Sequence, residues 1–259
     1  MTSRQLARQA ISLLEVYGLD TRKLLIGFAS TPRFIRTLNE YRLKSNDGPF
    51  RYQTKHLFPI LSDFAAQAGT ANGHYFHQDL WAAQKIYKSR PVMHLDIGSR
   101  IDGFVAHLLA FMPVTVIDIR PLSTNVSGLT FIQSDATDLA GIQDSSVESL
   151  SCLHAIEHFG LGRYGDPVEP EACFRAMRAL ARVLRPGGHL YFSVPVGIER
   201  VSFNAHRIFA PQTILDTFSG LKLLDFSAVN DEGDLVANCS PDGFVKSHFA
   251  CGLFEFTKP

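Results

Sequence analysis

Residues 93–103 read Met-His-Leu-Asp-Ile-Gly-Ser-Arg-Ile-Asp-Gly, and this stretch decides the fold of the chain. Its apolar side chains predict a short buried strand that carries Asp96 and ends at Gly98. Gly103 then opens a segment, residues 104–111, with the apolar spacing of a helix. A strand, a glycine turn and a helix form the first unit of a nucleotide-binding α/β fold. The turn lets a ligand approach the backbone, and the start of the helix offers free N–H groups.

The spacing of the glycines separates two kinds of cofactor. A dinucleotide fingerprint requires three glycines, the middle one so that a pyrophosphate can lie against the backbone. When the motif is aligned on Gly98 and Gly103, Arg100 occupies this middle position. A side chain of that size argues against NAD or FAD and is compatible with a smaller, positively charged cofactor across the strand ends.

Length and composition describe an ordinary globular chain. Its 259 residues, 46% of them hydrophobic and 19% charged, can bury a full core. The 25 basic and 25 acidic side chains cancel, so we expect neither a nucleic-acid nor a membrane partner. There is no apolar run of membrane-spanning length, no signal-peptide core and no ligand spacing among the four cysteines. The expectation is a cytoplasmic protein without a metal ion.

From residue 91 onward the pattern alternates strand and helix, which predicts an α/β fold with a mostly parallel sheet covered on both faces. We expect helices over residues 171–184 and 211–218, and strands over residues 92–96, 114–118, 129–133, 147–153, 189–194, 221–229 and 249–257. Only residues 119–128 separate the second and third strands, which is short for a parallel crossover. Either the helix there is vestigial or the boundaries are displaced.

The N-terminal part lacks this alternation. Helical stripes are predicted over residues 3–17, from about residue 31, over 57–66 and through 82–87. We therefore divide the chain into a helical N-terminal extension that caps the sheet, residues 1–90, and a Rossmann-like domain, residues 91–259.

Asp118 ends the second predicted strand, twenty residues after Gly98. A carboxylate at this place can accept hydrogen bonds from both hydroxyls of a ribose. The alternative is a solvated aspartate at a strand end. The spacing favours the ribose-binding role.

Several motifs, in order, resemble those of class I S-adenosylmethionine (SAM)-dependent methyltransferases. Asp96 and Gly98 match their first motif, the second glycine is missing, and Gly103 matches with one extra residue in the loop. Residues 152–159, Cys-Leu-His-Ala-Ile-Glu-His-Phe, are similar to their segment after strand four, and residues 184–190, Leu-Arg-Pro-Gly-Gly-His-Leu, resemble their turn into strand five. This resemblance implies a Rossmann-like, doubly wound sheet of seven strands with an antiparallel last strand, and SAM as cofactor.

Four longer stretches also look like the DUF268 family of uncharacterised proteins, which are methyltransferase-like in fold. They are His-Tyr-Phe-His-Gln-Asp-Leu-Trp at residues 74–81, residues 96–107, Ile-Asp-Ile-Arg-Pro-Leu at 117–122, and residues 158–166. This resemblance implies no particular substrate.

The methyltransferase resemblance implies cofactor-binding positions at the strand ends. An acid at the place of Asp135 accepts a hydrogen bond from the adenine amino group in such enzymes, and the alternative is a helix cap for residues 136–139. The expected cofactor-binding residues are Asp96, Gly98, Ser99, Arg100, Gly103, Asp118, Ile119, Asp135, Ala136 and His154.

The same reading places His158 near the substrate, where a neutral imidazole can take a proton. His206 is the second candidate base, and the alternative role for His158 is to brace the following loop. The expected substrate-binding residues are Tyr75, His77, Arg163, Tyr164, Asp166 and Arg207. Packing for Tyr75 and a surface ion pair for Arg207 are the alternatives.

The string His154-x-x-Glu157-His158 also matches the inverted zinc-protease motif. That motif needs a sustained helix, so that both histidines share one face. A strand precedes this string, and Gly160 and Gly162 follow it at once. Zinc hydrolysis is therefore disfavoured.

The function that we expect is SAM-dependent methyl transfer to a small molecule or a glycan precursor. One alternative is a non-catalytic binding protein that keeps the fold, suggested by Arg100 and Asp102 where glycines are expected. The other is a nicotinamide-dependent oxidoreductase, which Arg100 and the missing Tyr-x-x-x-Lys pair disfavour.

Overall fold

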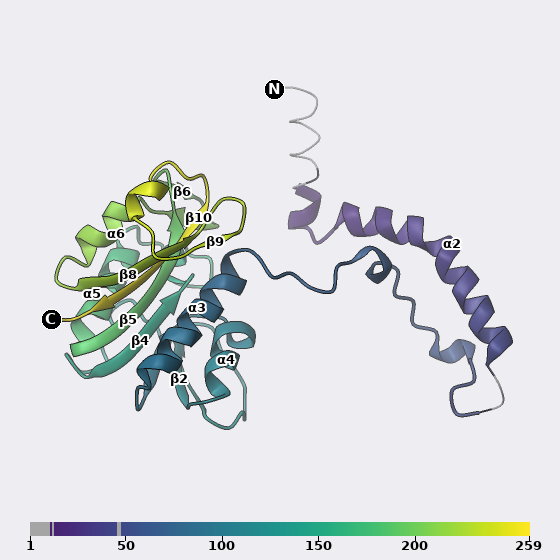
Figure 1. Ribbon diagram of the computed structural model, residues 1–259, viewed down its shortest axis with the longest axis horizontal. Coiled ribbons are helices and arrows are strands. Elements are labelled where there is room, and N and C mark those ends of the chain that lie inside the picture. Colours follow the sequence, from purple (N-terminus) through teal and green to yellow (C-terminus); the bar gives the residue numbers. More distant parts are fainter. Residues whose placement is uncertain (1–10, 12, 46–47) are drawn as a thin grey trace. The chain divides into compact units, whose positions relative to one another are not determined.

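The computed structural model describes residues 11, 13–45 and 48–259. The chain forms two compact units, Met1–Thr70 and Ala71–Pro259. Each unit is described by itself, and Figure 1 labels the elements of both.

The first unit contains one long helix, α2 (Thr21–Lys44). Asp20 caps it, because its carboxylate accepts a hydrogen bond of 2.9 Å from the backbone N–H of Lys23. The predicted start near residue 31 is wrong, since the helix runs through Pro32. The helix predicted over residues 3–17 lies mostly outside the described residues.

The segment after α2 holds two short 3-10 turns, Thr54–His56 and Asp63–Ala65. The helix predicted over residues 57–66 is therefore wrong. Pro59 gives a physical reason, because a proline disfavours the helical conformation at the residue before it and removes a hydrogen-bond donor. The unit has some packing of its own, with the Arg33 guanidinium 3.0 Å from the centre of the Phe64 ring.

The second unit is built on one sheet, to which eight strands contribute among the described residues, in the order β3-β2-β1-β4-β5-β10-β8-β9. They are β1 (His94–Ile97), β2 (Val114–Asp118), β3 (Leu129–Gln133), β4 (Val147–Leu153), β5 (Leu184–Val196), β8 (Lys222–Val229), β9 (Leu235–Val236) and β10 (Ala250–Thr257). Strands β1 to β5 are parallel, whereas β10 is antiparallel to both β5 and β8. The predicted Rossmann-like sheet with an antiparallel last strand is confirmed, and β9 adds a short edge.

The connection between β2 and β3 is as short as the sequence indicates. Residues 119–128 form bends and a turn, without a helix in this fully described stretch. The two strands nevertheless pair directly, with Val114 opposite Leu129. The strand boundaries were therefore right, and an extended loop replaces the usual crossover helix.

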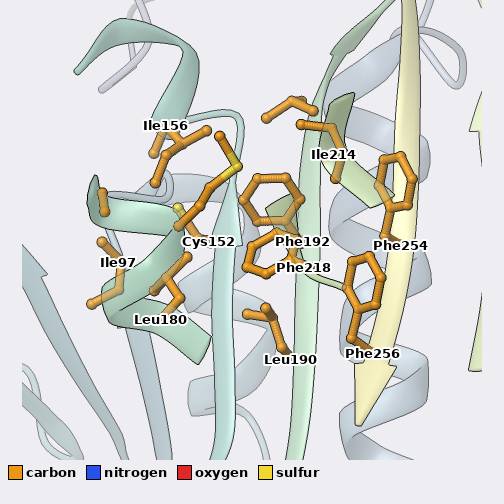
Figure 2. Close-up of a cluster of buried hydrophobic side chains, with 14 of the residues drawn as sticks. Ile97, Cys152, Ile156, Leu180, Leu190, Phe192, Ile214, Phe218, Phe254 and Phe256 are labelled. Carbon is orange, nitrogen blue, oxygen red and sulfur yellow. The ribbon is translucent and has the colours of Figure 1, made fainter. Parts of the chain in front are cut away.

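Helices cover both faces of the sheet (Figure 1). They are α3 (His74–Ser89) and α4 (Ala106–Leu109) on one face, and α5 (Ala172–Val183) and α6 (Pro211–Thr217) on the other. Figure 2 shows the second face, where the rings of Phe192, Phe218, Phe254 and Phe256 pack together. A separate hairpin, β6 (Arg200–Ser202) with β7 (His206–Ile208), follows β5.

Helix α3 belongs to the same compact unit as the sheet. Its side chains Trp81, Ala82 and Ile86 are buried in one cluster with Phe104 and Leu108. The unit therefore starts at Ala71, twenty residues before the boundary that strand alternation indicates, because the apolar stripe of α3 packs on the sheet. A capping role for the residues before it stays a prediction.

Candidate functional site

One cavity opens at the carboxyl ends of β1, β2 and β4. Its volume is about 770 Å³ when the open mouth is included. In open α/β sheets a ligand binds at these strand ends, because the loops there leave a crevice. Eleven residues that the sequence singles out line it: Tyr75, Gly98, Arg100, Asp118, Ile119, Asp135, Ala136, His154, His158, Tyr164 and Asp166.

Asp96 lies beneath the cavity, fully buried. It accepts hydrogen bonds from the backbone N–H and hydroxyl of Ser99, at 3.0 and 2.6 Å, and from the hydroxyl of Ser151, at 2.5 Å. Burial raises the pKa of Asp96 to about 6, although the three hydrogen bonds oppose this rise. Asp96 and Ser99 thus fix the start of the glycine turn.

The glycines of this turn are needed for space. Gly98 has a φ of +67°, and a Cβ there would lie 3.0 Å from the Cβ of Ala155. At Gly103 an added Cβ would come within 2.5 Å of the buried Asp79 carboxylate. Between them, Arg100 turns its guanidinium to Asp102, at 3.1 Å.

Asp118 is held by a residue that sequence reasoning missed. Arg120 donates from its backbone N–H and Nε to Oδ1, at 2.8 and 3.0 Å, and from its terminal nitrogen to Oδ2, at 2.5 Å. The same guanidinium lies 4.7 Å from the centre of the Tyr164 ring. Its signal in the sequence was its place two residues beyond the strand-end acid.

Asp135 follows β3 and closes a local turn. Its Oδ1 accepts a hydrogen bond of 2.8 Å from the backbone N–H of Thr137. Residues 136–139 contain bends at 137 and 138 and no helix, so the alternative of a helix cap is wrong. The carboxylate lies at the wall of the cavity together with Ala136.

His154 adopts a left-handed backbone conformation, with φ of 50°, directly after β4. Its Nδ1 lies 2.5 Å from Oε1 of Glu157, which is buried. Burial disfavours the charged form of each residue. For His154, the nearby Cys251 and Glu157 outweigh burial and raise the pKa. For Glu157, His154 outweighs burial and the pKa is lowered.

The zinc-protease arrangement is absent from this fully described segment. Only a 3-10 turn, η4 (Ile156–His158), follows His154. The two histidines therefore do not share the face of a sustained helix, as that motif requires. The expectation drawn from the flanking glycines is confirmed.

His158 has the protonation state of a base. Its Nδ1 lies 2.7 Å from the carbonyl oxygen of Ala205, which can only accept, so this nitrogen carries the proton and Nε2 keeps its lone pair. Burial lowers the pKa of His158, so the ring is neutral near pH 7. Its edge packs against Tyr164, with ring centroids 5.6 Å apart.

The predicted cofactor-binding residues Asp96, Ser99 and Gly103 do not line the described cavity. Nor do four of the predicted catalytic or substrate-binding residues: His77, Arg163, His206 and Arg207. The His206 ring packs 4.9 Å from that of Phe249, and Arg163 donates to the carbonyl of Ala205 at 2.8 Å. The proton-transfer role of His206 and the substrate-binding roles of the other three stay predictions.

Arg207 and Asp166 fix the loop that follows η4. The Arg207 guanidinium donates to the backbone carbonyls of Glu157, Phe159 and Pro170. Asp166 accepts from three backbone N–H groups, those of residues 160, 162 and 164. Burial opposes the charge of Asp166, but these hydrogen bonds outweigh it and lower the pKa.

Two comparisons at the level of sequence bear on this chain. The model of a family described as "Caenorhabditis protein of unknown function, DUF268" matches residues 137–238, which confirms the resemblance over that part. A search of curated proteins found no matching sequence.

Solved structures share the fold. The [4+2]-cyclase SpnF is 16% identical, with a TM-score of 0.50 over 76% of this chain and 90% of that one. The N-methyltransferase NodS from Bradyrhizobium japonicum WM9, in complex with S-adenosyl-L-homocysteine, is 15% identical, with a TM-score of 0.47 over 87% and 98%. The 1,6-didemethyltoxoflavin-N1-methyltransferase of Burkholderia thailandensis is 14% identical, with a TM-score of 0.47 over 70% and 78%. The chain has the fold of class I SAM-dependent methyltransferases, and such identities establish nothing finer.

Among the described residues, no helix is both long and apolar enough to cross a membrane.

Proposed function

We propose that this protein is a SAM-dependent methyltransferase that acts on a small molecule or a glycan precursor. The observation that carries the proposal is the convergence of Gly98, Asp118 and Asp135 on one cavity. These residues follow three neighbouring parallel strands, β1, β2 and β3. Each stands where the methyltransferase resemblance places a residue that binds SAM.

The chemistry of the cavity fits SAM. Asp118 keeps acceptor capacity for one ribose hydroxyl, because a carboxylate has about four lone-pair sites and Arg120 uses three of them. Ile119 and Ala136 offer apolar surface for a flat base, with Asp135 at its edge. The carboxylates would also suit a positively charged ligand.

When bound, SAM supplies a methyl group on a positively charged sulfur, ready for in-line displacement. The protein then has to orient the acceptor and exclude water. Such positioning can lower the activation free energy by roughly 7–11 kcal/mol. A general base adds a smaller factor, typically about 10²–10⁴. His158 is the candidate base, because its Nε2 is unprotonated and the residue lines the cavity.

Calorimetric titration with SAM and S-adenosylhomocysteine, with NAD(H) for comparison, tests the cofactor. We expect micromolar binding of the first two, and its loss in Asp118→Ala. Asp216→Ala, an exposed substitution on α6, is the matched control and should bind like the wild type. Binding of NAD(H) alone would overturn the proposal and revive the oxidoreductase alternative.

A second candidate is a protein of this fold that transfers no methyl group. The guanidinium–carboxylate pair of Arg100 and Asp102 in the degenerate glycine loop supports it. So does the description of the similar SpnF as a cyclase. SAM binding without methyl transfer to any of a panel of small-molecule and glycan acceptors would favour this candidate.

A further inference from the structure

Three residues from distant parts of the chain meet beside the cavity. His74 opens α3, His154 follows β4, and Cys251 lies in β10. Their ligand atoms all lie within 4.8 Å of one another. Cys251 and the His154 side chain are almost completely buried, so this is no chance surface cluster.

The outer nitrogens of the two rings are already occupied. His74 Nε2 lies 3.0 Å from the carbonyl oxygen of Phe249, and His154 Nδ1 lies 2.5 Å from the Glu157 carboxylate. Because both oxygens accept, both of these nitrogens carry protons. When both rings are neutral, His74 Nδ1 and His154 Nε2 then point lone pairs at each other across 3.1 Å. Two arrangements satisfy both nitrogens: a protonated His154 that donates from Nε2 to His74 Nδ1, or a metal ion between the rings.

We propose that His74, His154 and Cys251 bind a Zn²⁺ ion. Zinc prefers imidazole nitrogen and thiolate ligands, at bond lengths of roughly 2.0–2.3 Å and tetrahedral angles, which place the ligand atoms roughly 3.3–3.7 Å apart. The two nitrogens already have nearly this separation. The sulfur reaches it by a shift of about 1 Å from the outer limit of 4.8 Å.

The surroundings are those of a zinc site. Histidine ligands usually donate their second N–H to a carboxylate or a backbone carbonyl, which fixes the tautomer. Glu157 and Phe249 supply one of each. The Cys251 thiol interacts with His154 and makes two long contacts, 3.9 Å to Gln78 Oε1 and 3.9 Å to the carbonyl of Gly252. One of its partners is thus another residue of the proposed site.

The bound ion would have an open position. One of its three ligands, His74, also lines a surface groove together with Asp231 and Phe249. Three protein ligands leave the fourth tetrahedral position to solvent or to a ligand. This set shares only His154 with the zinc-protease motif and does not use His158.

Metal binding to the full-length, reduced protein tests the proposal. After removal of metal with a chelator, Zn²⁺ is titrated against a chromophoric competitor, and Co²⁺ is added as a spectroscopic probe. We expect one Zn²⁺ per chain and a tetrahedral cobalt spectrum with thiolate-to-cobalt charge transfer. Cys251→Ser should abolish the charge-transfer band, and His74→Ala should weaken zinc binding at least tenfold. Cys173→Ser, at a buried cysteine of α5 outside the cluster, should change neither.

Two outcomes would overturn the inference. One is that the wild-type protein neither binds one zinc ion per chain nor shows a charge-transfer band with Co²⁺. The contact between the two rings would then be explained by a hydrogen bond from protonated His154, and this result does not depend on whether any variant folds. The other is zinc binding that persists in both cluster variants. The test uses metal alone, so its result is independent of SAM binding and methyl transfer.

Discussion

Arg120 and Asp118 form a paired unit at the end of β2, in which the guanidinium and the backbone N–H of one residue hold both carboxylate oxygens of the other. The proposed ribose acceptor is therefore oriented before any ligand arrives. Preorganisation of this kind raises affinity by reducing the ordering that binding requires.

Arg120→Ala should weaken SAM binding modestly. The Arg120 side chain is about half exposed, and such ion pairs contribute up to about 1 kcal/mol, so we expect at most about a fivefold increase in Kd. Asp118→Ala removes the acceptor itself and should cost much more. Calorimetry on both variants makes the comparison; tighter binding in Arg120→Ala would show that the arginine competes with the ribose.

His158→Ala should lower kcat by roughly 10²–10⁴ if the acceptor is an oxygen, while SAM affinity stays unchanged. Because burial lowers the pKa of His158, its protonation should reduce the wild-type rate only below the ordinary histidine value. The rate should thus rise with pH on the acid side and be flat above pH 7. Unchanged turnover in the variant would remove His158 from the mechanism.

Asp96 should make the protein less stable as pH rises. Its pKa in the folded state, about 6, lies above the ordinary 3.8, so protonated Asp96 favours folding. That contribution is complete below pH 3.8 and is lost as pH rises through about 6. A pKa difference of about two corresponds to roughly 3 kcal/mol. Urea unfolding of the wild type and Asp96→Asn from pH 4 to 7 measures it; parallel pH profiles would contradict the prediction.

Gly160→Ala should destabilise the protein by more than about 2 kcal/mol, because two effects combine. Gly160 has a φ of +75°, and its added Cβ would overlap the backbone carbonyl of Glu169. Gly165→Ala is the matched control, since a φ of +87° strains it equally but no atom lies within 4 Å. Urea unfolding should show a smaller decrease in the free energy of unfolding for the control. Equal decreases would mean that the loop moves to accommodate the added Cβ at residue 160, and would contradict the prediction.

Several strands were predictable because they are short runs rich in apolar residues between turn residues. The range Val114–Asp118 matched the prediction, since buried parallel strands are rich in valine and isoleucine. Topology then explains why the strand-end acids meet. Asp118 and Asp135 follow parallel neighbours, so their positions in the chain already place them at one edge.

What the sequence concealed depends on long-range convergence. His74, 80 residues from His154, and Cys251 carry no local spacing that marks a cluster. The helical pattern alone could not tell that α3 packs on the sheet, because an amphipathic stripe indicates burial without naming its partner. The wrong prediction of a helix over residues 57–66 had another cause. Pro59 argued against a helix there, but the prediction gave more weight to the apolar residues.

The loop from Glu157 to Pro170 is held through its main-chain groups. Arg207 donates hydrogen bonds to backbone carbonyls of the loop, and Asp166 accepts hydrogen bonds from its backbone N–H groups. Every amino acid except proline carries both of these groups. Exchanging Arg163 or Tyr164 therefore leaves the path of the loop intact and alters only what it presents. In the proposed enzyme, the side chains of this loop can therefore change while its backbone keeps the same path. Relatives that methylate different acceptors can then share one loop conformation.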